Sequence, residues 1–389
     1  MTMERKRICF CTTIPGTIKA FLVDLSKYLV ENENYDVTFV TGEDDSLYQF
    51  TNDHIHYIPV KMKRGIAFDG LRCIWQMYRI FKHEKFDIVQ YSTRNASTYA
   101  SVAAWMAGVK TRIFGQWGMM FIAMKGLKRW LLKLDDIMVC ALSTNIETES
   151  FTIREEAIRE KVYKPEKSVV IWNGSACGVD ISKYDLSMKP TWRVEYRNKY
   201  GIPETATVFG YCGRITRDKG LNELFGAFKE LIENRKTENA YLMIIGANDH
   251  AETIDQGLFA WAKSSDRVIF TGYTRVVPQH YSALDVFCSL SYREGFGLVV
   301  IEAAGMGVPA IVTDCPGQWD TIIANKTGLH VPGHRVKEVV DAMEFYINNP
   351  DKTKAMGIQA RKDVEEKYDQ KTLFAKLAEH RNHLIEEHR

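Results

Sequence analysis

Two glutamates in the second half of the chain have a spacing that suits a phosphorylated ligand rich in hydroxyl groups. Glu294 and Glu302 bracket seven residues in the segment YREGFGLVVIEAAGMGVPAIVTDCPGQWD, residues 292–320. We expect a strand to end near Ser291 and a helix to begin near Leu298, with a glycine-bearing loop between them. The amides of such a loop and helix start attract negative charge, and carboxylates accept hydrogen bonds from sugar hydroxyls. The segment therefore predicts a site for a nucleotide sugar.

A second segment supplies positive charge. In GYCGRITRDKG, residues 210–220, a predicted strand ends at Gly213, and Arg214 and Lys219 follow in a loop before a helix. Two cations that converge on a diphosphate neutralise it as a leaving group. Arg217 lies between them, and we do not expect it to take part.

Together these segments resemble the retaining glycosyltransferases of family 4, which have the GT-B fold. The shared pattern is E-G-F-G-L-x-x-x-E-A-x-x-x-G-x-P-x-I, together with G-R-x(4)-K-G. The resemblance implies that Glu294 binds the donor sugar, that Glu302 binds the ribose, and that Arg214 and Lys219 act on the diphosphate. It also implies that the backbone at Gly213 and at Gly295, Phe296, Gly297 and Leu298 faces the donor.

Two further segments match the same family. FTGY, residues 270–273, lies at the end of a predicted strand, and the family's loop at this place contacts the base, which makes Thr271 and Tyr273 donor-binding candidates. WNGSACGVDISKY, residues 172–184, resembles the end of the family's N-terminal domain. Asn173 is a candidate there for contact with donor or acceptor, although an asparagine that forms a turn is the alternative.

The N-terminal half departs from the family pattern at two places. The first strand-to-helix turn, TTIPGTIKAF, has the single Gly16 where relatives often have a glycine pair. In RIFGQWGMMF, Trp117 stands where many relatives have a histidine, beside Gln116. We expect Gly16, Gln116 and Trp117 to be acceptor or phosphate contacts, with a packed core tryptophan as the alternative for Trp117.

No cofactor or metal is expected. The sequence has no Asp-x-Asp motif at a strand end, and its adjacent aspartate pairs at 44–45 and 135–136 have no ligand-like context. Arg214 and Lys219 would supply the positive charge that a metal supplies elsewhere, as the resemblance implies.

These residues need a scaffold of strands that alternate with helices. The expected strands fall at residues 7–12, 37–41, 55–60, 87–91, 111–114, 137–142 and 168–172, and again at 207–213, 241–246, 268–271, 285–289 and 310–313. Alternation of this kind predicts an α/β fold of two Rossmann-like doubly wound domains, with the site in a cleft between them. We expect an acceptor domain over 1–188, a donor domain over 189–369, and a terminal helix over 370–389 that returns to the first domain. The polar segment 185–199 is a candidate linker.

Composition is that of a globular chain with balanced charge. The 389 residues hold 51 Lys+Arg and 49 Asp+Glu, a net charge of +2, which does not indicate a nucleic-acid binder. The eight cysteines form no C-x-x-C pair, so we expect free thiols in a reducing compartment. Without a recognisable signal peptide or a long enough apolar run, the expected location is the cytoplasm, with contact at the inner face of the membrane left open.

One stretch is strongly basic. Residues 54–134 hold 14 Lys/Arg against 3 Asp/Glu, including Lys61, Lys63 and Arg64. Within it, residues 125–134 (KGLKRWLLKL) predict an amphipathic helix, with the cations Lys125, Lys128, Arg129 and Lys133 and the apolar residues Leu127, Trp130, Leu131 and Leu134. Such a helix suits an anionic membrane surface, and the alternative is an apolar face that packs on the domain's own sheet.

The sequence therefore favours a retaining, metal-independent transferase. It would move a hexose or N-acetylhexosamine from a nucleoside-diphosphate sugar, most simply a UDP-sugar, to a glycan or lipid-linked acceptor in cell-surface polysaccharide synthesis. A sugar-nucleotide epimerase and a non-catalytic partner in a polysaccharide complex are the alternatives.

Overall fold

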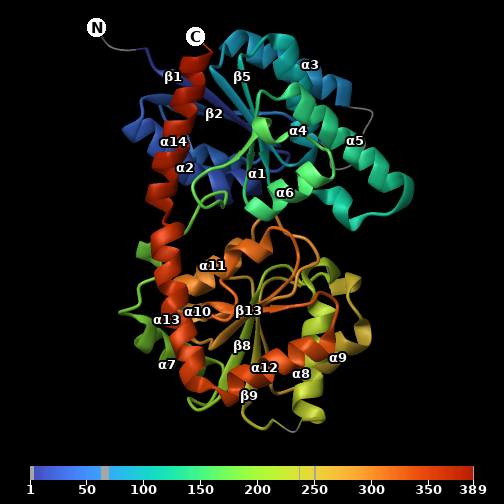
Figure 1. The fold of residues 1–389 in the computed structure, drawn as a ribbon. Helices are drawn as coiled ribbons and strands as arrows, with labels where there is room; N and C mark the ends of the chain where they lie inside the picture. Colours follow the sequence, from blue (N-terminus) through green and yellow to red (C-terminus); the bar gives the residue numbers. More distant parts are fainter. Residues whose placement is uncertain (1–3, 63–69, 236, 249–250, 389) are drawn as a thin grey trace. The chain divides into compact units, whose positions relative to one another are not determined.

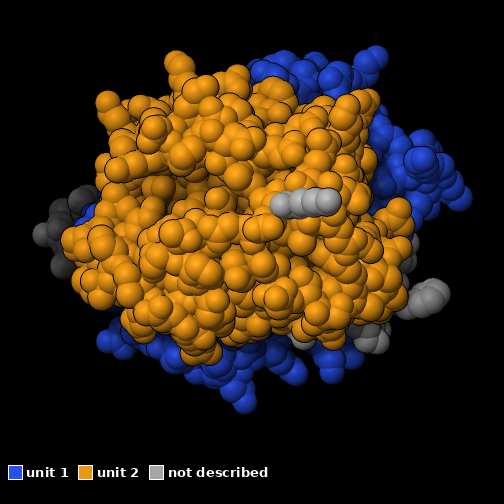
Figure 2. Space-filling model, turned by 90° about the horizontal axis from the view of Figure 1, so that it is seen from below, with its two compact units in different colours: residues 1–177, 371–389 blue, residues 178–370 orange. Residues whose placement is uncertain are grey.

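The chain folds into two α/β units. The computed structural model describes residues 4–62, 70–235, 237–248 and 251–388 (Figure 1). Unit 1 comprises residues 1–177 and 371–389, and unit 2 comprises residues 178–370 (Figure 2). The expected boundary lay after residue 188, but residues 178–188 pack in unit 2, where Val179 donates its backbone N–H to the Tyr368 carbonyl at 2.8 Å.

Unit 1 contains a seven-stranded parallel sheet in the order β3-β2-β1-β4-β5-β6-β7. Figure 1 shows α3, α4 and α5 on one side of this sheet and α2 and α14 on the other. The central strands β2, β1, β4 and β5 are largely buried, as parallel strands between two helical layers must be. The strand bounds are β1 Lys6–Cys11, β2 Tyr35–Thr41, β3 Ile55–Pro59, β4 Ile88–Ser92, β5 Thr111–Gln116, β6 Asn145–Thr148 and β7 Ser168–Val170.

The helices of unit 1 follow the expected alternation, with one exception. Their bounds are α1 Pro15–Thr17, α2 Val23–Asn32, α3 Gly70–Glu84, α4 Arg94–Ala107, α5 Gly126–Leu142, α6 Phe151–Arg159 and α14 Gln370–Glu387. The strand expected over 137–142 was wrong, because those residues are the last turns of α5. The strand at this place is β6, which begins at Asn145, directly after α5 ends.

Unit 2 contains a six-stranded parallel sheet in the order β10-β9-β8-β11-β12-β13. Figure 1 shows α8, α9 and α12 on one side and α7, α10, α11 and α13 on the other, and each side has its own buried apolar core. The strands are β8 Thr207–Cys212, β9 Ala240–Ile245, β10 Val268–Gly272, β11 Val286–Ser289, β12 Ala310–Thr313 and β13 Gly328–Val331. The helices are α7 Lys189–Lys199, α8 Leu221–Glu233, α9 Gln256–Ser264, α10 Val277–Ser282, α11 Leu298–Gly305, α12 Val336–Asn348 and α13 Pro350–Lys367.

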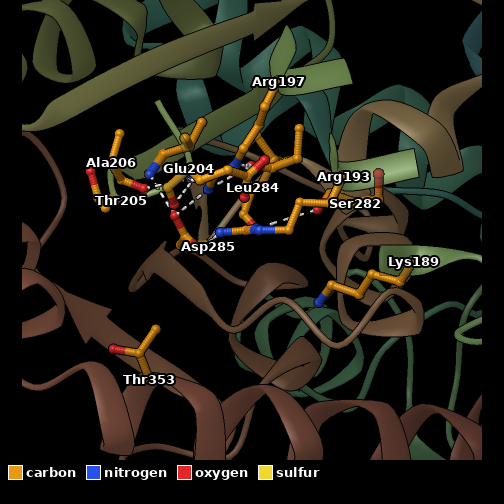
Figure 3. A network of polar contacts seen from close by, with 12 residues as sticks. Lys189, Arg193, Arg197, Glu204, Thr205, Ala206, Ser282, Leu284, Asp285 and Thr353 are labelled. Carbon is orange, nitrogen blue, oxygen red and sulfur yellow. Dashed lines mark hydrogen bonds and ion pairs between the residues drawn. The ribbon is translucent and has the colours of Figure 1, made fainter. Parts of the chain in front are cut away.

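The segment expected to be a linker, 185–199, contains helix α7, which is anchored by cations (Figure 3). Arg197 is fully buried, and its guanidinium donates to the Ala283, Pro203, Glu204 and Ala206 carbonyls and to Asp285 Oδ2 at 2.8 Å. Arg193 donates to the other oxygen of Asp285 at 2.7 Å. The linker prediction was therefore wrong, because Arg193 and Arg197 on α7 bind within unit 2 rather than facing solvent.

Candidate functional site

The two predicted motifs of unit 2 meet at one carboxylate. Lys219 Nζ lies 2.6 Å from Glu294 Oε1, and Ser291 Oγ donates to the same oxygen at 2.7 Å. Lys219 precedes α8 and Glu294 precedes α11, and these loops follow β8 and β11, which are neighbours in the sheet. Because parallel strands end at one edge, residues 75 positions apart come into contact there.

A buried polar layer holds the Glu294 loop in place. Thr313 Oγ1 donates to the Ser291 carbonyl at 2.6 Å, and the side-chain amide of Gln318 donates to Thr313 Oγ1 and to the Ser289 carbonyl. Ser289 Oγ in turn donates to Gln318 Oε1 at 3.0 Å. All four side chains are buried, so the layer fixes the loop from below and leaves the Glu294 carboxylate oriented before any ligand arrives.

The Gly-Phe-Gly loop presents backbone rather than side chains. Phe296 is buried and its ring packs at 5.4 Å from that of Tyr368, so this side chain is directed into the core. Gly297, at φ 96°, is the residue before α11, and as a glycine it has no side chain to cap the first amides of that helix. Leu298 begins the helix and packs against the same core as Phe296. Uncapped amides at a helix start are suited to an anion.

Glycines also line the ends of three adjacent strands. Gly213, Gly246 and Gly272 end or directly follow β8, β9 and β10, all with positive φ. A Cβ on Gly246 would lie 1.9 Å from the Gly213 carbonyl oxygen, so no side chain fits there. Next to this edge the Arg214 side chain is exposed, while its carbonyl accepts a hydrogen bond from Tyr211 Oη at 2.6 Å.

The two candidates on the β10 loop differ in exposure. Tyr273 is 75% exposed, whereas the Thr271 hydroxyl is half-buried and donates to the Gly272 carbonyl at 3.1 Å. Arg214 and Tyr273 therefore both present exposed side chains at this edge.

Glu302 lies beside two tyrosine hydroxyls. Burial raises the pKa of its carboxyl to about 7, and the hydroxyls of Tyr184 and Tyr281 and the charge of Lys183 oppose that shift. Cys212, at the end of β8, lies on the same side, and burial raises the pKa of its thiol to about 12. The second glutamate thus differs from Glu294, which is already paired with a cation.

The candidates of unit 1 divide into accessible and inaccessible residues. Gln116 is fully buried and accepts a hydrogen bond from Tyr163 Oη at 2.7 Å, so in this structure it does not line an open pocket as expected. Trp117 is half-buried and its ring lies 5.4 Å from that of Phe21. Asn173 is half-buried, and a Cβ on Gly16 would meet no other atom within 4 Å.

Several residues of the site were not predicted. Ser291, Gln318 and Thr313 belong to no sequence motif. Their role depends on contacts beneath the Glu294 loop, which only the tertiary structure shows. Tyr184 lies within the quoted segment 172–184, yet nothing local indicates that it faces Glu302. Gly246 could have been predicted as a site residue from the sequence, because it follows a buried strand directly, as Gly213 does.

Comparisons with known proteins identify relatives of both halves of the chain. Residues 18–177 match the family "Glycosyltransferase Family 4", and residues 193–363 match "Glycosyl transferases group 1". The chain is 28% identical over 387 residues, 99% of both chains, to the capsular polysaccharide biosynthesis glycosyltransferase CapM of Staphylococcus aureus. It is 24% identical over 297 residues, 74% of both chains, to the UDP-Gal:alpha-D-GlcNAc-diphosphoundecaprenol alpha-1,3-galactosyltransferase of Escherichia coli.

Solved structures show the same fold. A glycosyltransferase from Rickettsia africae superposes with a TM-score of 0.79 at 19% identity, covering 98% of this chain and 99% of the other. Anabaena HepE in complex with UDP and glucose superposes with a TM-score of 0.75 at 17% identity, covering 96% and 99%. The expected fold, two doubly wound domains of the GT-B type, is confirmed.

Proposed function

Since the chain belongs to the glycosyltransferases of the GT-B fold, with a family 4 domain followed by a group 1 domain, we propose that it is a retaining enzyme that uses a nucleoside-diphosphate sugar. The donor would be a UDP-linked hexose or N-acetylhexosamine, and the acceptor a glycan or lipid-linked glycan in cell-surface polysaccharide synthesis. Unit 2 would bind the donor and unit 1 the acceptor.

One observation carries the proposal. Lys219 and Glu294 form an ion pair of 2.6 Å beside the carboxyl ends of β8, β9 and β10, where glycines stand in place of residues with side chains. A glycine-lined edge lets a diphosphate approach the backbone closely, and Lys219 with Arg214 would neutralise its charge. The same Lys219 ammonium can donate to a phosphate oxygen while it keeps Glu294 in position, because an ammonium has three donors.

The carboxylates would bind the two sugars of the donor. Glu294 accepts hydrogen bonds only, so it would hold hydroxyls of the transferred sugar, and Glu302 would hold the ribose hydroxyls. As the bond from the anomeric carbon to the phosphate oxygen breaks, negative charge grows on the diphosphate. Arg214, Lys219 and the uncapped amides of α11 would stabilise that charge without a metal.

Two relatives support uridine as the donor base, and a third is named for a guanosine donor. HepE is titled as a complex with UDP, and the Escherichia coli relative is named for UDP-Gal. A mycobacterial relative that is 33% identical over 211 residues, 52% of this chain and 53% of its own length, is named as GDP-mannose-dependent. Full-length similarity to CapM supports the assignment to polysaccharide synthesis.

Thermal unfolding with UDP, GDP, ADP and their sugar conjugates tests the donor. A ligand at 100 times its Kd stabilises the fold by about 2.7 kcal/mol, which gives a clear rise in Tm. We expect one nucleotide series to stabilise the protein, and we expect Arg214→Ala to lose the effect while the neighbouring Arg217→Ala keeps it. If no nucleotide shifts the Tm of the folded protein, the donor site is refuted and the non-catalytic alternative is favoured.

Transfer itself separates the remaining alternatives. Incubation with the stabilising donor and a lipid-linked glycan acceptor should give an α-linked product from an α-linked donor, unchanged in the presence of EDTA. Recovery of the donor intact, with no sugar transferred or hydrolysed, or conversion of the donor to its epimer, would contradict the proposal.

A further inference from the structure

The fold divides the basic stretch 54–134 into separate groups. Lys63 and Arg64 lie outside the described residues. The predicted amphipathic helix forms the first half of α5, but two of its cations are paired, because Arg129 and Lys133 bind Glu160 at 2.7 and 2.8 Å. A further group, the lysines at positions 82, 85 and 110, lines a pocket of about 320 Å³.

This pocket lies at the edge of the unit 1 sheet where the strands begin. Its walls come from the ends of α3, α4 and α14 and from the residues directly before β4 and β5. Figure 1 shows α14 on one side of the sheet and α3 and α4 on the other, so the pocket lies where the two helical layers meet. The contacts expected at Gly16 and Trp117 instead follow the carboxyl ends of β1 and β5, the edge at which doubly wound sheets bind their main ligand. We call this cavity the amino-edge pocket.

The inner lining of the amino-edge pocket is apolar. Phe81, Phe86, Val109 and Ile385 line it, and each of them is between 1 and 5% exposed. The rings of Phe81 and Phe86 pack edge to face at 6.1 Å. Sites for small molecules are pockets of about 300 Å³ or more, lined by aromatic and aliphatic side chains with a few polar groups. The volume and the lining therefore suit a ligand with an aromatic or alkyl body.

The outer lining is positively charged. Lys82, Lys85 and Lys110 are exposed, and among the described residues that line the pocket only Asp87 has a carboxylate. Asp87 Oδ2 already accepts a hydrogen bond from the Arg7 backbone N–H at 2.8 Å. Three ammonium groups against one carboxylate favour an anionic ligand.

The ends of the helices do not account for all of this charge. A cation near the C-terminus of a helix offsets the helix dipole, and Lys110 does so directly, because its Nζ donates to the His388 carbonyl after α14 at 2.8 Å. Within the described ranges, the Lys82 and Lys85 side chains make no hydrogen bond or ion pair. Lys85 also has a φ of 48°, in the left-handed region that disfavours residues with a Cβ. Lys82 and Lys85 are therefore available to a ligand.

We infer that the amino-edge pocket binds a small, water-soluble organic anion with an aromatic or alkyl body. The body lies against Phe81, Phe86 and Ile385, and the acidic group lies between Lys82 and Lys85. None of the pocket's lining residues belongs to the candidate donor site in unit 2. The inference therefore concerns a second site and does not rest on the proposed function.

Fluorescence titration of the full chain with 8-anilinonaphthalene-1-sulfonate tests this inference. The probe is an aromatic anion whose emission rises in apolar surroundings. We expect saturable binding that weakens as salt is added, because salt screens exposed charges. Lys82→Gln with Lys85→Gln should weaken binding about tenfold, at about threefold for each exposed lysine. Ala107→Phe, which places a ring in the pocket, should abolish this binding, and both variants should retain the Tm of the unaltered chain.

Two controls separate the pocket from other places where the probe could bind. Lys125→Gln with Lys128→Gln removes the same charge beside the exposed side chains of Leu127 and Trp130 on α5, and this variant should bind the probe as the unaltered chain does. Excess UDP-glucose should leave the probe bound. A lack of saturable binding, unchanged binding in either pocket variant, an equal loss in the α5 variant, or displacement of the probe by UDP-glucose would each overturn the inference.

Discussion

The pKa of Glu302 predicts how donor binding depends on pH. If this carboxylate accepts hydrogen bonds from the ribose, only its ionised form binds well. With a pKa of about 7 in the free protein, about one tenth of the molecules are ionised at pH 6 and about nine tenths at pH 8. Affinity for the donor should therefore rise about tenfold from pH 6 to pH 8.

Tyr281 and Cys212, which face Glu302, do not change their protonation between pH 6 and pH 8. Burial raises the pKa of Tyr281 above its usual value and that of Cys212 to about 12. Calorimetry with UDP-glucose measures the effect, because a sugar diphosphate diester has no phosphate proton to lose between pH 6 and 8, unlike UDP. Glu302→Gln should bind weakly and with a flat pH profile. A wild-type profile without the rise, or the same rise in Glu302→Gln, would refute the reasoning.

Stability without ligand gives an independent check of the same group. The folded pKa of about 7 lies above the usual carboxyl value of 4.5, so the folded state holds the proton more tightly. Protonation favours folding, and this contribution is present at low pH and is lost as pH rises from about 4.5 to 7, by up to about 3 kcal/mol. The Tm of the unaltered chain should fall over this range relative to that of Glu302→Gln.

Three further predictions follow from the contacts of unit 2. Lys219→Met should lower kcat/KM at least about 100-fold in a transfer assay, since it removes a cation from the leaving group, and a loss below about fivefold would exclude that role. Asp285→Ala should lower the free energy of unfolding by about 3 kcal/mol in urea titration, because it leaves the buried Arg197 without its carboxylate; a change below about 1 kcal/mol would contradict this. Gly246→Ala should cost more than about 2 kcal/mol, because its Cβ would lie 1.9 Å from a carbonyl oxygen, and an unchanged Tm would show that the strand ends can separate.

Local patterns predicted most of the elements correctly. Alternation of apolar strands with amphipathic helices is a property of neighbouring residues, so the doubly wound architecture could be predicted without the tertiary structure. The errors occurred where a local pattern is ambiguous. Residues 137–142 read as a strand because a short apolar run fits a strand or a buried helix turn equally well. Residues 185–199 read as a linker because a buried arginine looks polar in sequence.

The sequence alone determined the residue types of the site, since Glu294, Glu302, Arg214 and Lys219 stand in patterns specific enough to indicate a nucleotide sugar. Only the tertiary structure decided which of them meet. Strand order places β8 beside β11 although more than 70 residues separate them, so Lys219 contacts Glu294 while Glu302 lies with Tyr184 and Tyr281. It also decided that Leu127, Trp130 and Leu131 of α5 are exposed, because an amphipathic sequence specifies an apolar face but not the surface that covers it.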